Sequence, residues 1–189
     1  MELSEELIVK QCSPTLAGLK TGNMFTCPWQ CSPEGKKAIL DHLRTLNSRL
    51  APYGLRILPL RFMKRRVLIY MYRPKQLSID LEHHIAKHIL GQKDYPTTSA
   101  ERCIVRLIHE MQQQEGFPHE IGLFLGYPAE DVLGFIQNQA QSAKWVGAWK
   151  VYGDETAARC KCAAYKRCTR AYCQAYRQHH SLDQLLQRH

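Results

Sequence analysis

Apolar residues recur at three- and four-residue intervals in several stretches of this sequence, the spacing that places them on one face of a helix. The clearest stretch is Pro33–Leu50, which ends where Ala51-Pro52-Tyr53-Gly54 follows. Further helices are predicted at Ser4–Gln11, Leu77–Leu90, Ser99–Gln114, Asp154–His179 and SLDQLLQ, and two short ones within Pro118–Asn138, separated by Gly126-Tyr127-Pro128.

Strands are predicted where apolar and polar residues alternate, or where β-branched and aromatic residues gather. Leu55–Met63 and Arg65–Arg73 form an expected antiparallel hairpin. Pro59 lacks a backbone donor, so the first arm is expected at a sheet edge or with a bulge. Trp145–Gly153 is a third predicted strand, and Leu16–Cys27 is either a bent strand or an extended loop.

These elements predict an α+β fold with one domain over residues 1–189. Its small antiparallel sheet of three or four strands is expected to contain the hairpin and Trp145–Gly153, and to pack against five or six helices. The N-terminal sequence lacks a basic region followed by an apolar stretch, so we expect no signal peptide. No apolar run approaches the roughly 20 residues that span a membrane. We therefore expect a cytoplasmic protein, without membrane contact, whose eight cysteines stay reduced.

The formal net charge of +9 is concentrated in two segments. Residues 61–75 have six basic and no acidic side chains, and residues 155–189 are also basic, whereas residues 76–154 are net acidic. The first cluster includes Arg61, Lys64, Arg65, Arg66 and Arg73. The second follows one face of the C-terminal helix, at Arg159, Lys166, Arg167, Arg170 and Arg177, opposite an apolar face that includes Cys168, Ala171 and Tyr172. Such local clusters favour a small anionic ligand, nucleic acid or an acidic partner protein.

The segment EIGLFLGYPAEDVLGFIQNQ is similar to the middle of a helix-turn-helix. Its second helix opens with Glu130 and Asp131, which repel phosphate, and it offers few side chains that read bases. A packed corner of two helices is therefore the favoured interpretation of this segment.

The spacing of cysteines and histidines argues against a metal framework. The four cysteines of the predicted C-terminal helix point in different directions, so they cannot converge on one ion. Cys27 and Cys31 are one residue farther apart than a thioredoxin-type pair. His84 and His88 share a helix face and are the weak candidates for metal ligands, but a third ligand has to come from another segment. Surface histidines are the favoured interpretation.

Three segments, FPHEIGLFLGYPAEDVLGFI, WKVYGDETAA and YKRCTRAYC, resemble an uncharacterised family, a domain of unknown function found mostly in Clostridia and related anaerobic Firmicutes. LAGLK and RRVLIYMYR are also similar to it, so the resemblance spans most of the chain. It implies a small soluble protein of no established activity, whose genes often lie near flavodoxin and ferrous-iron transport genes. The family motif falls on Lys20, Arg66, Tyr70, His119, Glu120, Tyr127, Asp131, Lys150, Tyr152 and Cys168.

The density of polar residues in the family-like segments favours a polar pocket for a small anionic ligand. The expected catalytic residues are His119, Glu120 and Cys168, with Cys168 as a nucleophile beside His119 and its thiolate favoured by neighbouring basic side chains. The expected ligand-binding residues are Lys20, Arg66, Tyr127, Asp131, Lys150 and Tyr152. Whether the protein is an enzyme stays open on the sequence.

Two other classes of function are kept as alternatives. One is a nucleic-acid-binding or regulatory module that uses the basic hairpin and the C-terminal helix, whose affinity would fall steeply with salt. The other is an iron- or other metal-linked binding protein, which fits the gene neighbourhood and the cysteine and histidine content. The sequence identifies no cofactor.

Overall fold

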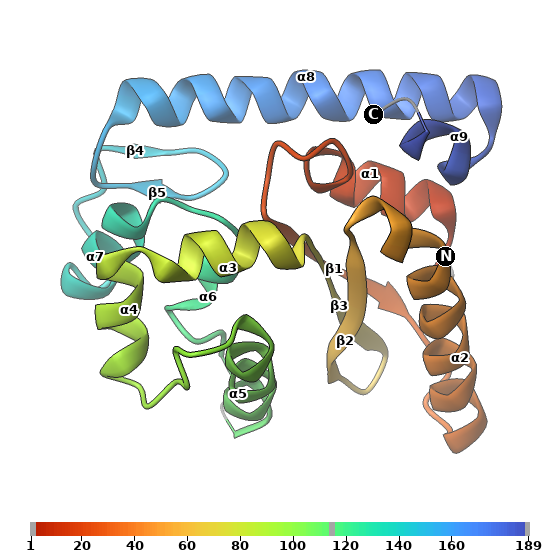
Figure 1. Cartoon of the computed structure of the whole chain (residues 1–189), viewed down its shortest axis with the longest axis horizontal. Coiled ribbons are helices and arrows are strands. Elements are labelled where there is room, and N and C mark those ends of the chain that lie inside the picture. The colour runs from red at the N-terminus through yellow and green to blue at the C-terminus, as the bar shows by residue number, and fades with distance from the viewer. Residues whose placement is uncertain (1–2, 114–115, 188–189) are drawn as a thin grey trace. The chain divides into compact units, whose positions relative to one another are not determined.

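The structure is a computed structural model that describes residues 3–113 and 116–187 (Figure 1). Its helices and small antiparallel sheets confirm the α+β class. Internal contacts divide the chain into two compact units: Met1–Pro74 together with Arg167–His189, hereafter the first unit, and Lys75–Lys166, hereafter the second unit. The single domain expected over the whole chain stays a prediction.

The first unit contains a three-stranded antiparallel sheet in the order β1-β3-β2. The predicted hairpin is confirmed as β2 (Arg56–Phe62) and β3 (Arg66–Tyr72). β1 (Gly22–Pro28) resolves the earlier choice between strand and loop in favour of a strand. β2 lies at a sheet edge and its register shifts between Pro59 and Arg61, so the proline has both of its expected effects.

The helices of the first unit are α1 (Glu5–Leu16), α2 (Pro33–Leu50), the 3-10 helix η1 (Ala51–Tyr53) and α9 (Leu182–Leu186), together with the end of α8 (Glu155–His179). The hydroxyls of Ser4 and Ser32 cap α1 and α2 by accepting hydrogen bonds from backbone amides three residues later. α1 runs through Pro14 and past its predicted end, because the side chains of its last turn, Leu16 among them, are buried in the core.

Each unit buries its own apolar core. In the first unit, Ile8, Leu46, Ile69 and Leu182 join α1, α2, β3 and α9 in one cluster, and each is at most 1 % exposed. In the second unit, a cluster of buried residues consists of Trp149, Val151, Ala158 and Cys162. These cores fix the positions of the polar side chains that are described next.

Arg73, which follows β3, lies inside the first unit and not on the basic surface expected from the sequence. Its guanidinium donates hydrogen bonds to the backbone carbonyls of Thr15 (2.8 Å), Leu16 (2.6 Å) and Tyr53 (3.2 Å). These carbonyls belong to the C-terminal ends of α1 and η1, where a helix lacks internal donors. Arg73 therefore joins two helix ends to the sheet, and the basic hairpin cluster loses one of its members.

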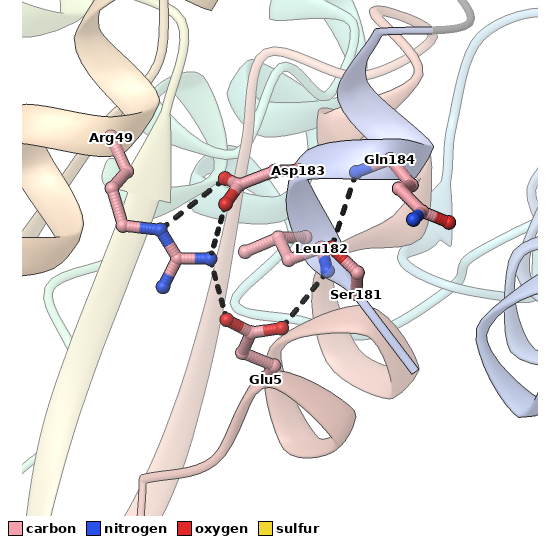
Figure 2. Close-up of polar contacts among 6 residues, drawn as sticks. All are labelled: Glu5, Arg49, Ser181, Leu182, Asp183 and Gln184. Atoms are coloured by element: carbon pink, nitrogen blue, oxygen red, sulfur yellow. Dashed lines mark hydrogen bonds and ion pairs between the residues drawn. The ribbon is translucent and has the colours of Figure 1, made fainter. Parts of the chain in front are cut away.

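A second polar cluster links the N-terminal helices of the first unit to α9 near the C-terminus (Figure 2). Arg49 of α2 donates to both carboxylate oxygens of Asp183 in α9, at 3.3 and 2.9 Å, and to Glu5 of α1 at 2.6 Å. The other oxygen of Glu5 accepts the backbone amide of Leu182 at 2.9 Å. This network fastens α9 to α1 and α2 beside the core.

The second unit is mainly helical. Its elements are α3 (Pro74–Glu82), α4 (His84–Gly91), α5 (Ala100–Gln113), α6 (Ile121–Phe124), α7 (Ala129–Gln137), a hairpin of β4 (Trp145–Val146) and β5 (Lys150–Val151), and the start of α8. The helix predicted at Leu77–Leu90 is two helices, because His83 adopts an extended backbone between them. Ser99 caps α5 as expected, and the predicted last residue of that helix, Gln114, lies outside the described residues.

The prediction that Trp145–Gly153 is one strand of the main sheet is wrong. This segment turns at Gly147 and Ala148, so β4 and β5 pair with each other in a separate two-stranded sheet. A Cβ atom at Gly147 would lie 2.3 Å from the Trp145 ring, so any other residue here requires this ring to move. The break at His83 divides one expected helix into two, and the described residues contain nine α-helices, against the five or six expected.

α8 confirms the predicted amphipathic helix, with one exception. The basic side chains at Arg159, Lys166, Arg167, Arg170 and Arg177 are exposed, while Ala158, Cys162 and Tyr172 are buried. Ala171, which was expected on the apolar face, is exposed. Neither α8 nor any other helix of residues 3–113 and 116–187 is long and apolar enough to cross a membrane.

Buried tyrosines make alkaline pH destabilising. Burial is the main cause that raises the pKa of Tyr165 and of Tyr172 to about 12. An unfolded chain releases these protons at pH about 10, so the folded state binds more protons between pH about 10 and 12. Stability is therefore complete below pH 10 and is lost as pH rises above it, by at most about 1.4 kcal/mol per tyrosine and pH unit.

Urea unfolding at a series of pH values measures this loss. Replacing both residues, Tyr165→Phe and Tyr172→Phe, removes two ionisable hydroxyls and should make the decline above pH about 10 less steep. Part of the decline remains, because burial also raises the pKa of Tyr95 and of Tyr127. A variant whose stability falls as steeply as that of the wild type contradicts the assignment to these two tyrosines.

Candidate functional site

A cavity of about 330 Å³ in the second unit brings together four of the predicted site residues, His119, Tyr127, Asp131 and Lys150. The segments that form it are the start of α6, α7 and the β4–β5 hairpin. The other lining residues are mostly apolar: Phe117, Pro118, Ile121, Gly122, Val132, Phe135 and Trp149. The lining is therefore more apolar than the polar pocket that the sequence suggested.

Asp131 holds the walls of this cavity together. It lies in the first turn of α7, where a carboxylate stabilises the helix dipole, and is only 3 % exposed. Its Oδ2 accepts the indole N–H of Trp149 at 2.7 Å, and its Oδ1 accepts the amides of Tyr152 and Gly153 at 2.8 and 2.7 Å. Because both oxygens already have donors, Asp131 positions the β4–β5 hairpin against α7 and is poorly placed to receive a ligand.

Tyr127 and Trp149 form an aromatic wall. Their rings stack with centroids 5.0 Å apart, and the Tyr127 hydroxyl donates to the carbonyl of Ala148 at 3.1 Å. Burial raises the pKa of Tyr127, which keeps the hydroxyl protonated as a donor. Tyr152 does not line the cavity; its side chain packs so closely on Gly134 that a Cβ there would lie 2.5 Å from the Cβ of Tyr152.

His119 and Lys150 are the basic groups of the cavity. The His119 ring centroid lies 5.3 Å and the Lys150 Nζ 5.9 Å from the centroid of the Phe135 ring, so both flank the same apolar wall. Lys150 is half-buried and donates one hydrogen bond to the carbonyl of Ala140 at 2.6 Å. In the described part of the chain, Lys150 has no carboxylate within ion-pair distance. Two of its three N–H donors therefore have no protein acceptor there.

Glu120 does not line the cavity, although its neighbours in sequence do. It is 1 % exposed, accepts a hydrogen bond from the Tyr95 hydroxyl at 3.0 Å and lies 3.9 Å from the Lys93 ammonium. Burial, and then the charge and hydrogen bond of Glu120, raise the pKa of Tyr95. Through these contacts Glu120 holds the loop that follows α4. Its catalytic role stays a prediction.

The remaining predicted site residues belong to the first unit. Lys20 and Tyr70 are buried, and Arg66 is exposed and hydrogen-bonded to Thr26. Cys168 is half-buried on α8, and burial raises the pKa of its thiol, whereas the sequence suggested a stabilised thiolate. His119 lies in the second unit, so no observed contact supports the predicted Cys168–His119 pair, which stays a prediction.

The described side chains provide no metal site. His84 and His88 are exposed on α4; the first packs against His83 and the second lies 3.2 Å from the Gln92 amide nitrogen. Over residues 3–113 and 116–187, no three His, Cys, Asp or Glu side chains are arranged to hold a metal ion. All eight cysteines are free thiols.

A comparison with known protein families matches residues 8–186 to the family described as Protein of unknown function (DUF3793). The chain belongs to this family. The match confirms the resemblance to an uncharacterised family, while the range of organisms stays a prediction. No curated protein and no solved structure matches the chain.

The cavity of this DUF3793 member also contains residues that the sequence did not single out. Phe135, Trp149 and Phe117 line it, and Phe117 is 62 % exposed. Trp149 was expected to be an ordinary strand residue. The sequence feature that could have pointed to Trp149 is the run of aromatic residues around Lys150. Such a run does not distinguish a residue of the core from one that lines a cavity.

Proposed function

We propose that this DUF3793 protein binds a small organic anion with an apolar body in the cavity of the second unit. The observation that carries the proposal is the combination of an aromatic wall with two basic groups, His119 and Lys150, that both lie near the Phe135 ring. Ligand cavities are typically apolar, with a few polar groups that fix orientation. The apolar body contacts the aromatic wall, and the anionic group accepts hydrogen bonds from Lys150.

Electrostatics favours an anion over a cation in this cavity. Asp131, the one carboxylate in the described lining, already accepts hydrogen bonds from three N–H groups, so its oxygens are poorly available to a cation. The half-buried Lys150 has two N–H donors to spare, and a hydrogen bond to a charged group contributes about 1.5–3 kcal/mol.

Eight free thiols support a reducing compartment, so we place this binding protein in the cytoplasm.

Two fluorescent probes test the proposal. Anilinonaphthalene sulfonate combines an aromatic body with one anionic group, and phenylnaphthylamine has a closely similar body without the charge. We expect Lys150→Gln to weaken sulfonate binding about tenfold, the equivalent of about 1.4 kcal/mol, and to change binding of the neutral probe less than about twofold.

Lys144→Gln is the matched control for this experiment. Lys144 also lies beside the β4–β5 hairpin and donates to a backbone carbonyl, that of Gly153 at 2.9 Å, but it does not line the cavity. Its replacement removes the same charge and should leave the affinity of both probes unchanged. Equal effects of the two variants on the sulfonate probe, or no saturable binding of either probe, contradict the proposal.

An interaction of α8 with nucleic acid or an acidic protein is a second proposal. It is supported by the exposure of Arg167, Arg170 and Arg177 along one helix. Such binding differs from binding in the cavity because its affinity falls steeply with salt concentration. The metal-linked alternative has no support from the geometry of the described side chains.

A further inference from the structure

A second hollow lies in the first unit, where α1 faces β1. Its volume is about 470 Å³. Leu7 of α1 and Phe25 and Pro28 of β1 provide an apolar surface within it. The polar lining residues are Lys10, Gln11, Thr26 and Arg66. We call this hollow the α1–β1 groove; none of its residues belongs to the cavity discussed above.

Arg66 is held in a fixed orientation at this groove. Its Nε donates to the Thr26 hydroxyl at 2.7 Å and its Nη2 to the Thr26 carbonyl at 2.8 Å. A guanidinium has five N–H donors, so three of them have no acceptor among the described residues. Because β1 already restrains the side chain, a ligand that binds the guanidinium orders fewer torsions than it would on a free surface arginine.

Lys10 supplies a second positive charge. Glu6 precedes it by four residues on α1, yet no ion pair joins the two side chains. In the residues that the structure describes, neither Lys10 nor Arg66 has a carboxylate within ion-pair distance. Two cations thus face one groove without an internal counter-charge, beside the hydroxyl of Thr26 and the amide of Gln11.

This donor set fits a phosphate group better than a carboxylate. A phosphate monoester has up to two negative charges and three terminal oxygens, so it can accept hydrogen bonds from a guanidinium fork and from a separate ammonium at the same time. The groove is also larger than a phosphate ion, and its apolar surface offers contact to the alcohol part of an ester. We propose that the α1–β1 groove binds a phosphate monoester, with Arg66 and Lys10 on the phosphate and Leu7, Phe25 and Pro28 against the organic part.

Amide NMR with phenyl phosphate tests the groove directly. We expect saturable shifts of the Gln11 and Thr26 amides, and a dissociation constant that rises about tenfold in Lys10→Gln and in Arg66→Gln. Among the described residues the Lys10 side chain makes no hydrogen bond or ion pair that its replacement would break, so this variant keeps the test valid if Arg66→Gln folds poorly. Arg65→Gln is the matched control, because it removes the same charge from the next residue, which is exposed and outside the groove.

Two outcomes overturn the proposal: an equal weakening in Arg65→Gln, which indicates unspecific charge attraction, or no saturable shift of the groove amides. Lys150→Gln should not change this dissociation constant. The proposal for the α1–β1 groove can therefore fail while the proposal for the cavity of the second unit stands, and the reverse. Co-sedimentation with phosphatidylcholine vesicles that contain phosphatidic acid distinguishes the source of the phosphate. Binding to these vesicles that is lost in Lys10→Gln supports the groove with a lipid as its ligand, and phenyl phosphate binding alone supports it with a soluble ester.

Discussion

Replacing Arg73 by methionine is expected to lower the free energy of unfolding by about 3 kcal/mol. The change removes three hydrogen bonds from a charged donor: the carbonyls of Leu16 and Tyr53 lose this donor, and that of Thr15 keeps the Gly18 amide. Each such bond contributes about 1.5–3 kcal/mol, but the effects are not additive and the half-buried site lets water replace some of them. Since both helix ends depend on one side chain, α1 and η1 are destabilised together.

Urea unfolding followed by circular dichroism measures the effect. Arg73→Lys should recover part of the loss, because an ammonium keeps the charge but lacks the planar fork that reaches three carbonyls. Arg65→Met is the control. Arg65 is exposed, so its replacement should change the unfolding free energy by less than about 0.5 kcal/mol. A loss in Arg73→Met no larger than that in the control contradicts the assigned role.

Asp131→Ala is expected to have the second large effect, a loss of about 3 kcal/mol. It leaves the indole N–H of Trp149 and the amides of Tyr152 and Gly153 unpaired inside the second unit. The β4–β5 hairpin then loses its hydrogen bonds to α7 and keeps the packing of Tyr152 on Gly134. We expect the Trp149 indole resonance to move toward its value in water and the affinity for anilinonaphthalene sulfonate to fall.

The neighbouring Glu130→Ala provides a control that also removes one carboxylate from the first turn of α7. Glu130 is exposed, and its one ion pair, to His83 at 3.8 Å, joins two exposed side chains, so we expect a loss below about 1 kcal/mol. Asp131→Asn should lie between the two, because an amide oxygen can still accept but its NH₂ group faces a donor. Equal losses at positions 130 and 131 mean that helix charge, and not the three hydrogen bonds, is what Asp131 provides.

The elements that sequence predicts well are those with local causes. Pro33–Leu50 has a serine cap, an early proline and a regular apolar face, and the helix has these bounds. The hairpin around Lys64 is equally local, and Pro59 marks its edge strand. The break at His83 has no such mark, because the apolar face continues on both sides of it. The turn at Gly147 depends on how closely the Trp145 ring approaches, which spacing does not reveal.

The candidate site was accessible to sequence only in part. Resemblance to the family placed His119, Tyr127, Asp131 and Lys150 on one list, and the structure brings them to one cavity. The resemblance did not show that Asp131 is a structural acceptor, because an aspartate in the sequence can bind either a ligand or a backbone amide. The aromatic walls were missed because apolar side chains look alike in a core and around a cavity. Arg73 likewise resembled a surface charge until its three carbonyl partners were known.

The discontinuous first unit has a consequence for synthesis on the ribosome. Arg49 has its partner Asp183, and Glu5 has its partner, the backbone amide of Leu182, more than one hundred residues later in the chain. At about 5–20 residues per second, the N-terminal part of this unit waits several seconds for α9, while the whole of Lys75–Lys166 emerges first. The segment made earliest is thus the one whose core closes last. During that interval the face of α1 that contacts α9 lacks this cover.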